Sequence, residues 1–237
     1  MKYIDLTLPS PAANLACDEA LLDRCEAGEL DEILRFWEPQ EPFVVVGYAN
    51  PVEREVHIES CRKANVPVLR RCSGGGTVLQ GMGCLNYSLL LRISEAGPLR
   101  GISGTNLFIM DRHQAALQSL VRGRVRVQGH TDLTLDNLKF SGNAQRRRKR
   151  FLIFHGTFLL NFDIPQIEQF LRMPSRQPDY RQNRAHSKFL TNLNLSSESL
   201  KSALRKTWNA DSILPALPPV PPALLEKYSS EAWNHKF

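Results

Sequence analysis

The stretch Arg70-Arg71-Cys72-Ser73-Gly74-Gly75-Gly76-Thr77-Val78 carries the most structural information in this chain. It follows a strand-like segment at 66–70. Three consecutive glycines lack Cβ atoms and tolerate positive φ, so their N–H groups can surround an anion. The two arginines add positive charge suited to a phosphate or a carboxylate. The stretch is neither a P-loop nor a dinucleotide-binding G-x-G-x-x-G motif. It predicts an anion-binding loop, with a flexible glycine turn and solvated arginines as the alternative.

Lys139 is the centre of a second informative stretch, at 132–145. It lies between Leu138 and Phe140 on an expected strand. A lysine there is either an edge charge that faces solvent or an ammonium that points at a ligand, and the spacing alone favours the edge. The turn that follows, at Ser141 and Gly142, can bring the backbone close to a ligand.

His155 marks a third stretch, His155-Gly156-Thr157, inside a long expected strand. A histidine beside a glycine in a strand is more often a core residue with satisfied hydrogen bonds than a catalyst. A run of basic residues at 146–150 precedes it. We interpret this run as a solvated loop. Docking of an acidic protein is favoured over nucleic-acid contact, because no aromatic residues are interleaved with the charges.

The composition is that of an ordinary globular protein. The 237 residues are 42% hydrophobic and 23% charged, with a formal net charge of +6. These values exclude a disordered chain, a collagen and a disulfide-dense mini-protein. No apolar run reaches the ~20 residues that span a bilayer, and the N-terminus lacks the apolar core of a secretory signal. We therefore expect no membrane partner.

All the cysteines lie in the first 84 residues, and none belongs to a C-x-x-C pair. A zinc site is therefore not expected, and the sequence assigns no metal ligands. Free thiols are typical of a reducing compartment, so we expect a cytoplasmic location. The cysteines are Cys17, Cys25, Cys61, Cys72 and Cys84.

Hydrophobic patterning predicts helices and strands in a mixed order. The expected helices are at 14–25, 105–120, 164–171 and 197–208, with Gly28 ending the first and Asp163 capping the third. The expected strands are at 43–47, 66–70, 85–93, 124–128, 138–141 and 151–162. The order has no regular β-α-β rhythm. It predicts an α+β fold with a mixed, mostly antiparallel sheet flanked by helices.

A proline-rich segment at 215–228 reads PALPPVPPALLEKY. Its prolines are Pro215, Pro218, Pro219, Pro221 and Pro222. Proline lacks a backbone donor and fixes φ, so we expect an extended strap over the surface rather than a helix or a central strand.

Taken together, these motifs resemble the lipoate–protein ligase family. Its members carry R-R-x-S-G-G-G-[TA]-V, K-[IVF]-S-G and H-G-T-L in this order. The chain matches them with its glycine-rich loop, with Lys139-Phe140-Ser141-Gly142 and with His155-Gly156-Thr157. Shorter matches are Asn14-Leu15-Ala16 with Glu19, Val45-Val46-Gly47 with Asn50-Pro51, and Thr191-Asn192-Leu193.

The resemblance implies a sheet-based catalytic domain shared with biotin ligases and similar to class II tRNA-synthetase cores. It implies a reaction in two steps. Lipoate or octanoate and ATP give an acyl-AMP and pyrophosphate, and a lysine of a lipoyl-domain protein then takes the acyl group. The acceptor would be an E2 subunit of a 2-oxoacid dehydrogenase or an H protein of the glycine-cleavage type, and no nucleic acid is expected. Mg²⁺ would accompany the phosphates.

The family pattern also assigns residues. Lys139 would be the catalytic residue and contact both the acyl carboxylate and the α-phosphate, because an ammonium between two anions offsets their repulsion. The other implied ATP-binding residues are Arg71, Ser73, Gly74, Gly75, Gly76, Thr77, Val78, Leu79 and Asp132. The expected acyl-binding residues are Val46, Gly47, Leu85, Tyr87, His155, Gly156 and Thr157, with Val44, Val45 and Leu159 as further candidates for an apolar slot.

Two departures from the family leave alternatives open. Its loop commonly continues H-D-x-G-N, whereas this chain reads Gln80-Gly81-Met82-Gly83-Cys84, which puts nucleotide or metal contacts there in question. Only about 40 residues follow the Thr191 motif, too few for an accessory domain with its own core. We expect a catalytic domain at 1–195, with a C-terminal helix and the strap packed on it at 196–237. Either one domain performs both steps, or an accessory chain contributes, or the protein accepts a preformed acyl-adenylate.

Three rival functions remain. A related group transfers octanoyl or lipoyl groups between carriers through a cysteine thioester, and needs a thiol near the lysine site in the C-terminal half. This chain has no cysteine after Cys84, which leaves Cys72 in the anion loop as the one to suspect. A biotin ligase is disfavoured because K-W-P-N-D is absent. The last alternative is a non-catalytic relative that binds lipoyl proteins.

Overall fold

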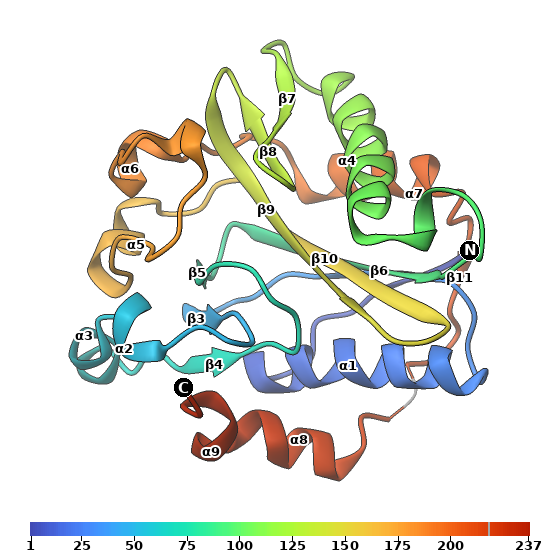
Figure 1. The fold of residues 1–237 in the computed structure, drawn as a ribbon, viewed down its shortest axis with the longest axis horizontal. Helices are drawn as coiled ribbons and strands as arrows, with labels where there is room; N and C mark the ends of the chain where they lie inside the picture. Colours follow the sequence, from blue (N-terminus) through green and yellow to red (C-terminus); the bar gives the residue numbers. More distant parts are fainter. Residues whose placement is uncertain (218) are drawn as a thin grey trace.

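The computed structural model describes residues 1–217 and 219–237. Within these residues, a sheet of eight strands runs through the molecule beside a small sheet of three (Figure 1). The large sheet has the order β11-β1-β2-β6-β10-β9-β8-β7, and the small sheet has the order β4-β3-β5. The strands are β1 (Lys2–Asp5), β2 (Ile33–Trp37), β3 (Phe43–Val46), β4 (Val68–Arg70), β5 (Val78–Gln80), β6 (Cys84–Arg92), β7 (Val125–Gln128), β8 (Asp132–Leu135), β9 (Leu138–Arg147), β10 (Phe151–Leu159) and β11 (Ser212–Ile213).

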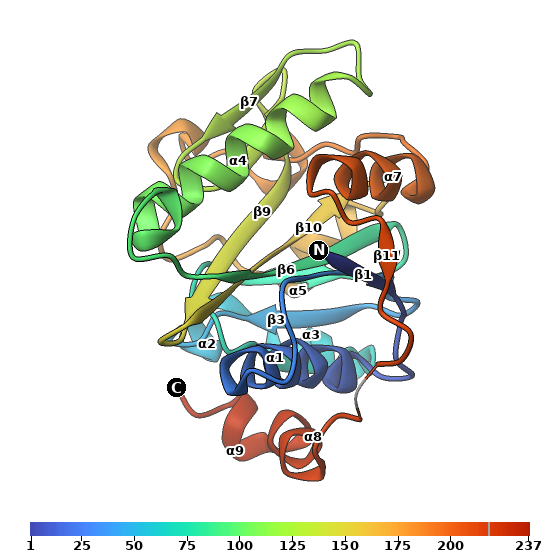
Figure 2. The same cartoon turned by 90° about the vertical axis from the view of Figure 1, so that its right-hand side faces the viewer.

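Helices cover both faces of the large sheet. Figure 2 shows α4 and α7 on one face, α1 on the other, and α8 and α9 beyond α1. The short helices α2, α3, α5 and α6 gather beside the small sheet (Figure 1). The helices are α1 (Pro11–Ala27), α2 (Val52–Glu55), α3 (Ile58–Lys63), α4 (Ile102–Gln118), α5 (Pro165–Phe170), α6 (His186–Phe189), α7 (Ser197–Thr207), α8 (Pro222–Ser229) and α9 (Glu231–Asn234), with 3₁₀ turns η1 (Pro98–Arg100) and η2 (Asp179–Arg181). None of these described helices is long and apolar enough to cross a membrane.

Strand pairing confirms the expected α+β fold. In the large sheet, every neighbour from β2 through β6, β10, β9 and β8 to β7 is antiparallel, whereas β1 pairs in parallel with β2 and β11. In the small sheet, β3 is parallel to β4 and antiparallel to β5. The central strand β10 lies between β6 and β9. Its His155 pairs with Ser88 and Ala144, so the His155-Gly156-Thr157 motif lies in the middle of the sheet.

Side-chain alternation along β6 divides the core between the two faces of the sheet. Leu89 joins Ile109 of α4 and Leu204 of α7 in the cluster on one face. Leu90 joins Leu21 of α1 and other residues on the opposite face. The whole strand except Arg92 is buried, which is why its sequence reads as a nearly continuous apolar run.

The predicted end of α1 is confirmed, because Gly28 follows the helix with φ 85°. The helix begins earlier than predicted, at Pro11, and the Ser10 side chain caps it by accepting a hydrogen bond from the Ala13 N–H. The prediction for α5 was wrong in its cap: Ile164, not Asp163, occupies that position and makes no side-chain cap. Pro165 begins the helix, where a missing N–H costs no helical bond.

Two other predictions need correction. The proline-rich segment is not a strap throughout, because Pro222 begins α8, where proline fits the first helical position. Pro218 of that segment lies outside the described residues. The basic run at 146–150 is not simply a solvated loop either, because β9 continues through Arg147. Sequence reading also missed β1, β2, β5, β8 and β11.

Candidate active site

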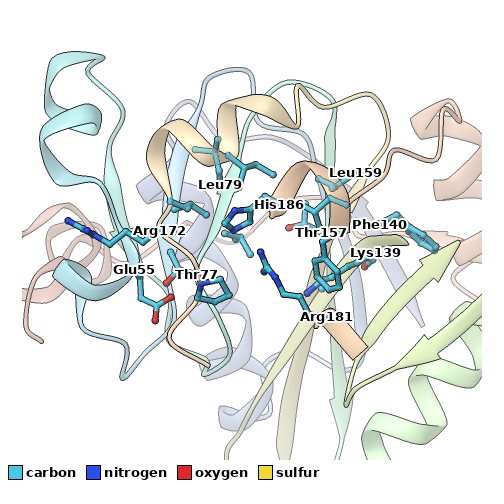
Figure 3. Close-up of a pocket in the computed structure, with 18 residues that line it drawn as sticks. Glu55, Thr77, Leu79, Lys139, Phe140, Thr157, Leu159, Arg172, Arg181 and His186 are labelled. Atoms are coloured by element: carbon cyan, nitrogen blue, oxygen red, sulfur yellow. The ribbon is translucent and has the colours of Figure 1, made fainter. Parts of the chain in front are cut away.

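Two adjoining cavities lie where the large and small sheets meet the segment 172–189. The larger has a volume of about 760 Å³ and is lined by strands β5, β6, β9 and β10 and by the glycine-rich loop. The smaller has a volume of about 110 Å³, and apolar side chains such as Leu79, Leu159 and Phe189 form much of its wall (Figure 3). Thr77, Val78, Lys139, Gly142, Thr157 and Arg181 line both cavities.

The glycine-rich loop has a conformation that requires glycine at two places. Gly75 has φ +88°, a region that L side chains rarely adopt. A Cβ on Gly47 would lie 2.1 Å from the Gly75 carbonyl oxygen, so the end of β3 must come this close to the loop. The Asn50 side chain donates to the same carbonyl at 3.0 Å. Gly75 and Gly76 line the larger cavity, whereas Gly74 and Ser73 do not.

Arg71 lies behind the loop and holds its shape. Its Nη2 donates to the carbonyls of Gly74 and Gly76 at 2.7 and 2.6 Å, and its Nε donates to Ser73 Oγ at 3.1 Å. Burial lowers the pKa of the guanidinium to about 10, so it stays charged at neutral pH. The loop carbonyls therefore turn towards Arg71, which also reaches the wall of the larger cavity.

Arg70, expected at the mouth of the loop, is instead fully buried. Its Nη1 donates to the carbonyls of Gly47, Tyr48 and Asn50, and its Nη2 donates to the Asn234 carbonyl. Since all these partners are neutral carbonyls of the turn that follows β3 and of α9, Arg70 joins the C-terminal helix α9 to the back of the site. It lines neither cavity among the described residues.

The Lys139 ammonium points into the cavities rather than into open solvent. Its Nζ lies 2.8 Å from Asp132 Oδ1, and the side chain is 24% exposed. The lysine lines both cavities together with Thr77 and Val78, and the larger one also with Gly76, so it shares this space with the loop. Its backbone is fixed from the other side, because the Thr191 N–H donates to the Lys139 carbonyl at 2.9 Å.

His155 is the centre of a buried polar chain at the end of the larger cavity, near Trp37. Its Nε2 lies 2.6 Å from Ser73 Oγ, and its Nδ1 lies 3.2 Å from Asp18 Oδ2. Asp18 also pairs with the fully buried Arg35 at 2.5 Å. Burial opposes ionisation of Asp18, but Arg35, His155 and Ser88 outweigh it and hold the pKa of the carboxyl below its usual value. This series of hydrogen-bonded side chains links α1, β2, β10 and the glycine-rich loop.

The departure from the family loop is accommodated by a hydrogen-bonded triangle. Gln80 Nε2 donates to Thr157 Oγ1 at 2.8 Å, Asn86 Nδ2 donates to Gln80 Oε1 at 2.9 Å, and Thr157 Oγ1 donates to Asn86 Oδ1 at 2.5 Å. All three side chains line the larger cavity. A Cβ on Gly81 would lie 3.3 Å from Pro42 and from the Phe162 ring, so a side chain here would require these neighbours to shift by a few tenths of an ångström.

The structure places only some of the residues expected in the acyl slot on the walls of the cavities. Val45, Tyr87, His155, Gly156 and Thr157 line the larger cavity, and Leu159 lines the smaller. Val44, Val46 and Leu85 belong to the packed cores instead. For Val44 and Val46 the reason is strand alternation, which turns them away from the face on which Val45 lines the larger cavity. Gly47 lines neither cavity and lies under the Gly75 carbonyl.

Sequence reading missed an entire wall of the site, the segment 172–189. It contributes Pro174, Arg176, Arg181 and Phe189 to the larger cavity. The Tyr180 hydroxyl donates to Asp132 Oδ2 at 2.7 Å, so Asp132 joins this segment to Lys139. Leu15 and Asn143 lie in stretches that the sequence analysis noted but were not assigned to the site, and Trp37 lies in no motif.

The cysteines lie outside both cavities. All five are free and buried, and none lines either cavity among the described residues. Burial raises the pKa of the Cys72 thiol to about 12, with Glu19 adding to the effect. Within the same residues no group of three or more His, Cys, Asp or Glu side chains is placed to hold a metal ion.

The basic run at 146–150 makes mainly internal contacts. Arg146 donates to the Cys72 carbonyl at 2.8 Å, and Arg147 donates to the carbonyls of Leu99 and Arg100. Arg148 pairs with Asp23 of α1 at 2.8 Å. Only Lys149 and Arg150 are exposed, which leaves little of the run free for a docking partner.

The Lipoyl protein ligase A/B catalytic domain family matches residues 10–213, and the chain belongs to this family. A curated relative, the putative lipoate-protein ligase A of Aeropyrum pernix, is 33% identical over 68% of this chain. The chain spans 58% of that relative's length. The octanoyltransferase LipM of Geobacillus kaustophilus is 25% identical over 99% of this chain and 98% of its own.

Solved structures confirm the fold. The bi-partite lipoate protein ligase of Thermoplasma acidophilum, studied with its E2 lipoyl domain, has a TM-score of 0.80 at 21% identity and covers 99% of this chain and 96% of its own. A lipoate-protein ligase A bound with ATP has a TM-score of 0.79 at 22% identity and covers 99% of both chains. Ligases and octanoyltransferases among the relatives share transfer of a lipoyl or octanoyl group.

Proposed function

We propose that this protein activates lipoate or octanoate with ATP and passes the acyl group to a lysine of a lipoyl-domain protein. The observation that carries the proposal is the place of Lys139, which lines both cavities opposite the glycine-rich loop. A carboxylate and a phosphate repel each other, and an ammonium between them offsets that repulsion in the ground state and in the transition state. Holding both groups in contact supplies a further part of the rate.

The two cavities suit the two substrates. We place the acyl chain in the larger cavity, against Val45, Trp37 and Tyr87, because a medium-length acyl chain needs a long, partly apolar slot. We place the nucleotide at Thr77, Val78 and Leu79, where the apolar smaller cavity opens beside the loop. Arg71 pre-forms this loop from behind. Mg²⁺ would accompany the phosphates of the nucleotide.

The acceptor is proposed to be a lipoyl domain of the E2 or H-protein type, in the cytoplasm. The Thermoplasma ligase was studied with such a domain and is bi-partite, which supports this acceptor and an accessory chain for the present protein. The acceptor lysine must lose a proton before it attacks the acyl-adenylate. No described residue is assigned that role.

The LipM-like relatives favour a second candidate function, octanoyl transfer through a thiol. Such an enzyme needs an accessible thiolate beside the lysine. All the described cysteines are buried outside the cavities, and burial raises their pKa values. These placements support the adenylate route over the thioester route.

Mass spectrometry of a purified lipoyl domain tests the proposal. The domain is incubated with the protein, Mg²⁺ and either lipoate or octanoate, with and without ATP. We expect a mass gain that requires ATP. A gain without ATP from an acyl-carrier donor would support the thiol route instead. A gain only from synthetic lipoyl-AMP would mean that the first step belongs to another protein.

A further inference from the structure

Arg181 is a buried arginine at the junction of the two cavities. It ends η2, is 5% exposed, and lines both cavities. Figure 3 shows its side chain extending into the pocket towards His186, close to Lys139. The residue lies in the segment 172–189, outside every motif that the sequence offered.

The Arg181 guanidinium has few partners for a buried charge. Its Nε donates to the Arg184 carbonyl at 3.0 Å, its Nη2 contacts the Met173 sulfur at 3.6 Å, and its plane lies over the Phe189 ring at 4.7 Å. A guanidinium carries five N–H donors, so most of them are unused. Within the described residues, no carboxylate lies within 4.0 Å of it, since none of the ion pairs involves Arg181.

The surroundings of Arg181 add positive charge instead of balancing it. Lys139 faces the same cavity. His186 lines it too, but burial, together with Arg181 and Lys139, lowers the pKa of its imidazole to about 4, so it is neutral at pH 7 and adds no charge. Two acids lie nearby, but Lys139 and the Tyr180 hydroxyl already occupy both oxygens of Asp132, and Glu55 accepts a hydrogen bond from Ser175. The junction therefore holds more cationic than anionic groups in a place where unpaired charge is costly.

We propose that Arg181 is a second phosphate ligand of the site, binding the phosphates of the nucleotide or the pyrophosphate that leaves. This inference rests on the proposed function, because it takes the junction as the place where the phosphates lie. A phosphate fits the guanidinium fork and supplies the missing negative charge. Thr77, Val78 and Leu79, which we assign to the nucleotide, line the same small cavity as Arg181.

Binding measurements on the whole protein test this site. Wild type, Arg181→Met and Arg184→Met are titrated with Mg-ATP, with inorganic pyrophosphate and with AMP. Arg184 is a matched control because it lies over the same Phe189 ring, at 5.1 Å, and makes hydrogen bonds to neighbouring carbonyls, but lines neither cavity. We expect Arg181→Met to weaken Mg-ATP about 10- to 100-fold, the effect of losing a charge-assisted pair. Arg184→Met should leave the affinity unchanged.

The three probes locate the contact, and folding is checked separately. Weaker binding of pyrophosphate but not of AMP places Arg181 on the leaving phosphates, whereas weaker binding of AMP places it on the α-phosphate.

Unliganded Arg181→Met should melt at or above the wild-type temperature, because replacing an unpaired buried charge by an apolar side chain is often neutral or stabilising. Wild-type affinity of Arg181→Met for all three probes, or no binding of any probe by wild type, would overturn the proposal.

The binding and modification measurements together distinguish failure of the phosphate site from failure of the proposed ligase function. If Arg181→Met loses ATP affinity and wild type modifies no lipoyl domain, the phosphate site stands and the proposed function fails. If Arg181→Met modifies the lipoyl domain with the wild-type rate and the wild-type KM for ATP, the ligase stands and the phosphate site fails.

Discussion

The Lys139 ammonium lies 2.8 Å from Asp132 Oδ1, and the other oxygen of that carboxylate accepts the Tyr180 hydroxyl at 2.7 Å. One carboxylate thus aims the ammonium into the cavities and joins it to the segment that covers them. The Tyr180 hydroxyl stays protonated, because burial and Asp132 raise its pKa. The pair is partly shielded, with side chains 24% and 15% exposed.

Asp132→Asn tests this aiming role. The amide keeps the shape and an acceptor for Tyr180, but removes the negative charge beside Lys139. We expect acyl-adenylate formation to slow by about tenfold or more, because a misplaced catalytic group loses its advantage of position. ATP should bind at least as tightly, since the cavity becomes more positive. Rate measurements at saturating ATP check this, and a variant with wild-type kcat would show that Asp132 does not position the lysine.

The glycine-rich loop offers a matched pair of substitutions. Gly75→Ala places a Cβ at φ +88° and 2.9 Å from Arg71 Nη2, whereas a Cβ on Gly74 meets no atom within 4 Å. A left-handed non-glycine residue costs about 1–2 kcal/mol. We expect Gly75→Ala to lower both the melting temperature and the affinity for ATP, and Gly74→Ala to change stability little. Equal effects of the two substitutions on stability would mean that the loop conformation is wrong.

Cys72 separates the two chemical routes. Its side chain is buried beside Glu19 and Tyr228, on the side of the loop that faces the C-terminal helices, and burial raises the pKa of the thiol to about 12. We expect Cys72→Ser to retain acyl transfer, and wild type to resist inactivation by iodoacetamide at neutral pH. Loss of acyl transfer in a correctly folded Cys72→Ser variant would support the thioester route instead.

His113 makes stability depend on pH. Complete burial lowers its pKa to about 3, and its Nε2 accepts the Trp208 indole N–H at 3.0 Å. The unfolded chain, with a histidine pKa near ~6.5, binds the proton first, so the free energy of unfolding falls as pH drops from ~6.5 towards 3. The slope from one proton is at most about 1.4 kcal/mol per pH unit. In His113→Gln, which keeps an acceptor for Trp208, denaturant unfolding should show a shallower slope; an unchanged slope would contradict this account.

Local chemistry explains which parts of the site could be predicted from the sequence. Gly75, Lys139 and His155 lie in short motifs. Their residue types indicate a bend at Gly75, a charge within a strand at Lys139 and a polar group within a strand at His155. Each needs only its neighbours along the chain to be noticed. The α+β class followed in the same way, from periodicity and from the absence of a β-α-β rhythm.

Tertiary contacts explain which parts could not be predicted. Arg70 and Arg71 are adjacent in sequence, yet Arg70 binds carbonyls from the turn after β3 and from α9, while Arg71 binds the loop. The strand β2 was missed because Arg35 interrupts an apolar run, and its burial depends on Asp18 and Asn14 of α1, which are distant in sequence. Arg181 was missed because an arginine in a polar loop looks solvated until the fold buries it.

The release of pyrophosphate from ATP, measured with and without lipoate or octanoate, tests the central role of Lys139 most directly. We predict release by wild type only when an acyl acid is present, and release by Lys139→Ala at least about 100-fold slower with an unchanged melting temperature. Release by Lys139→Ala at the wild-type rate would contradict the account.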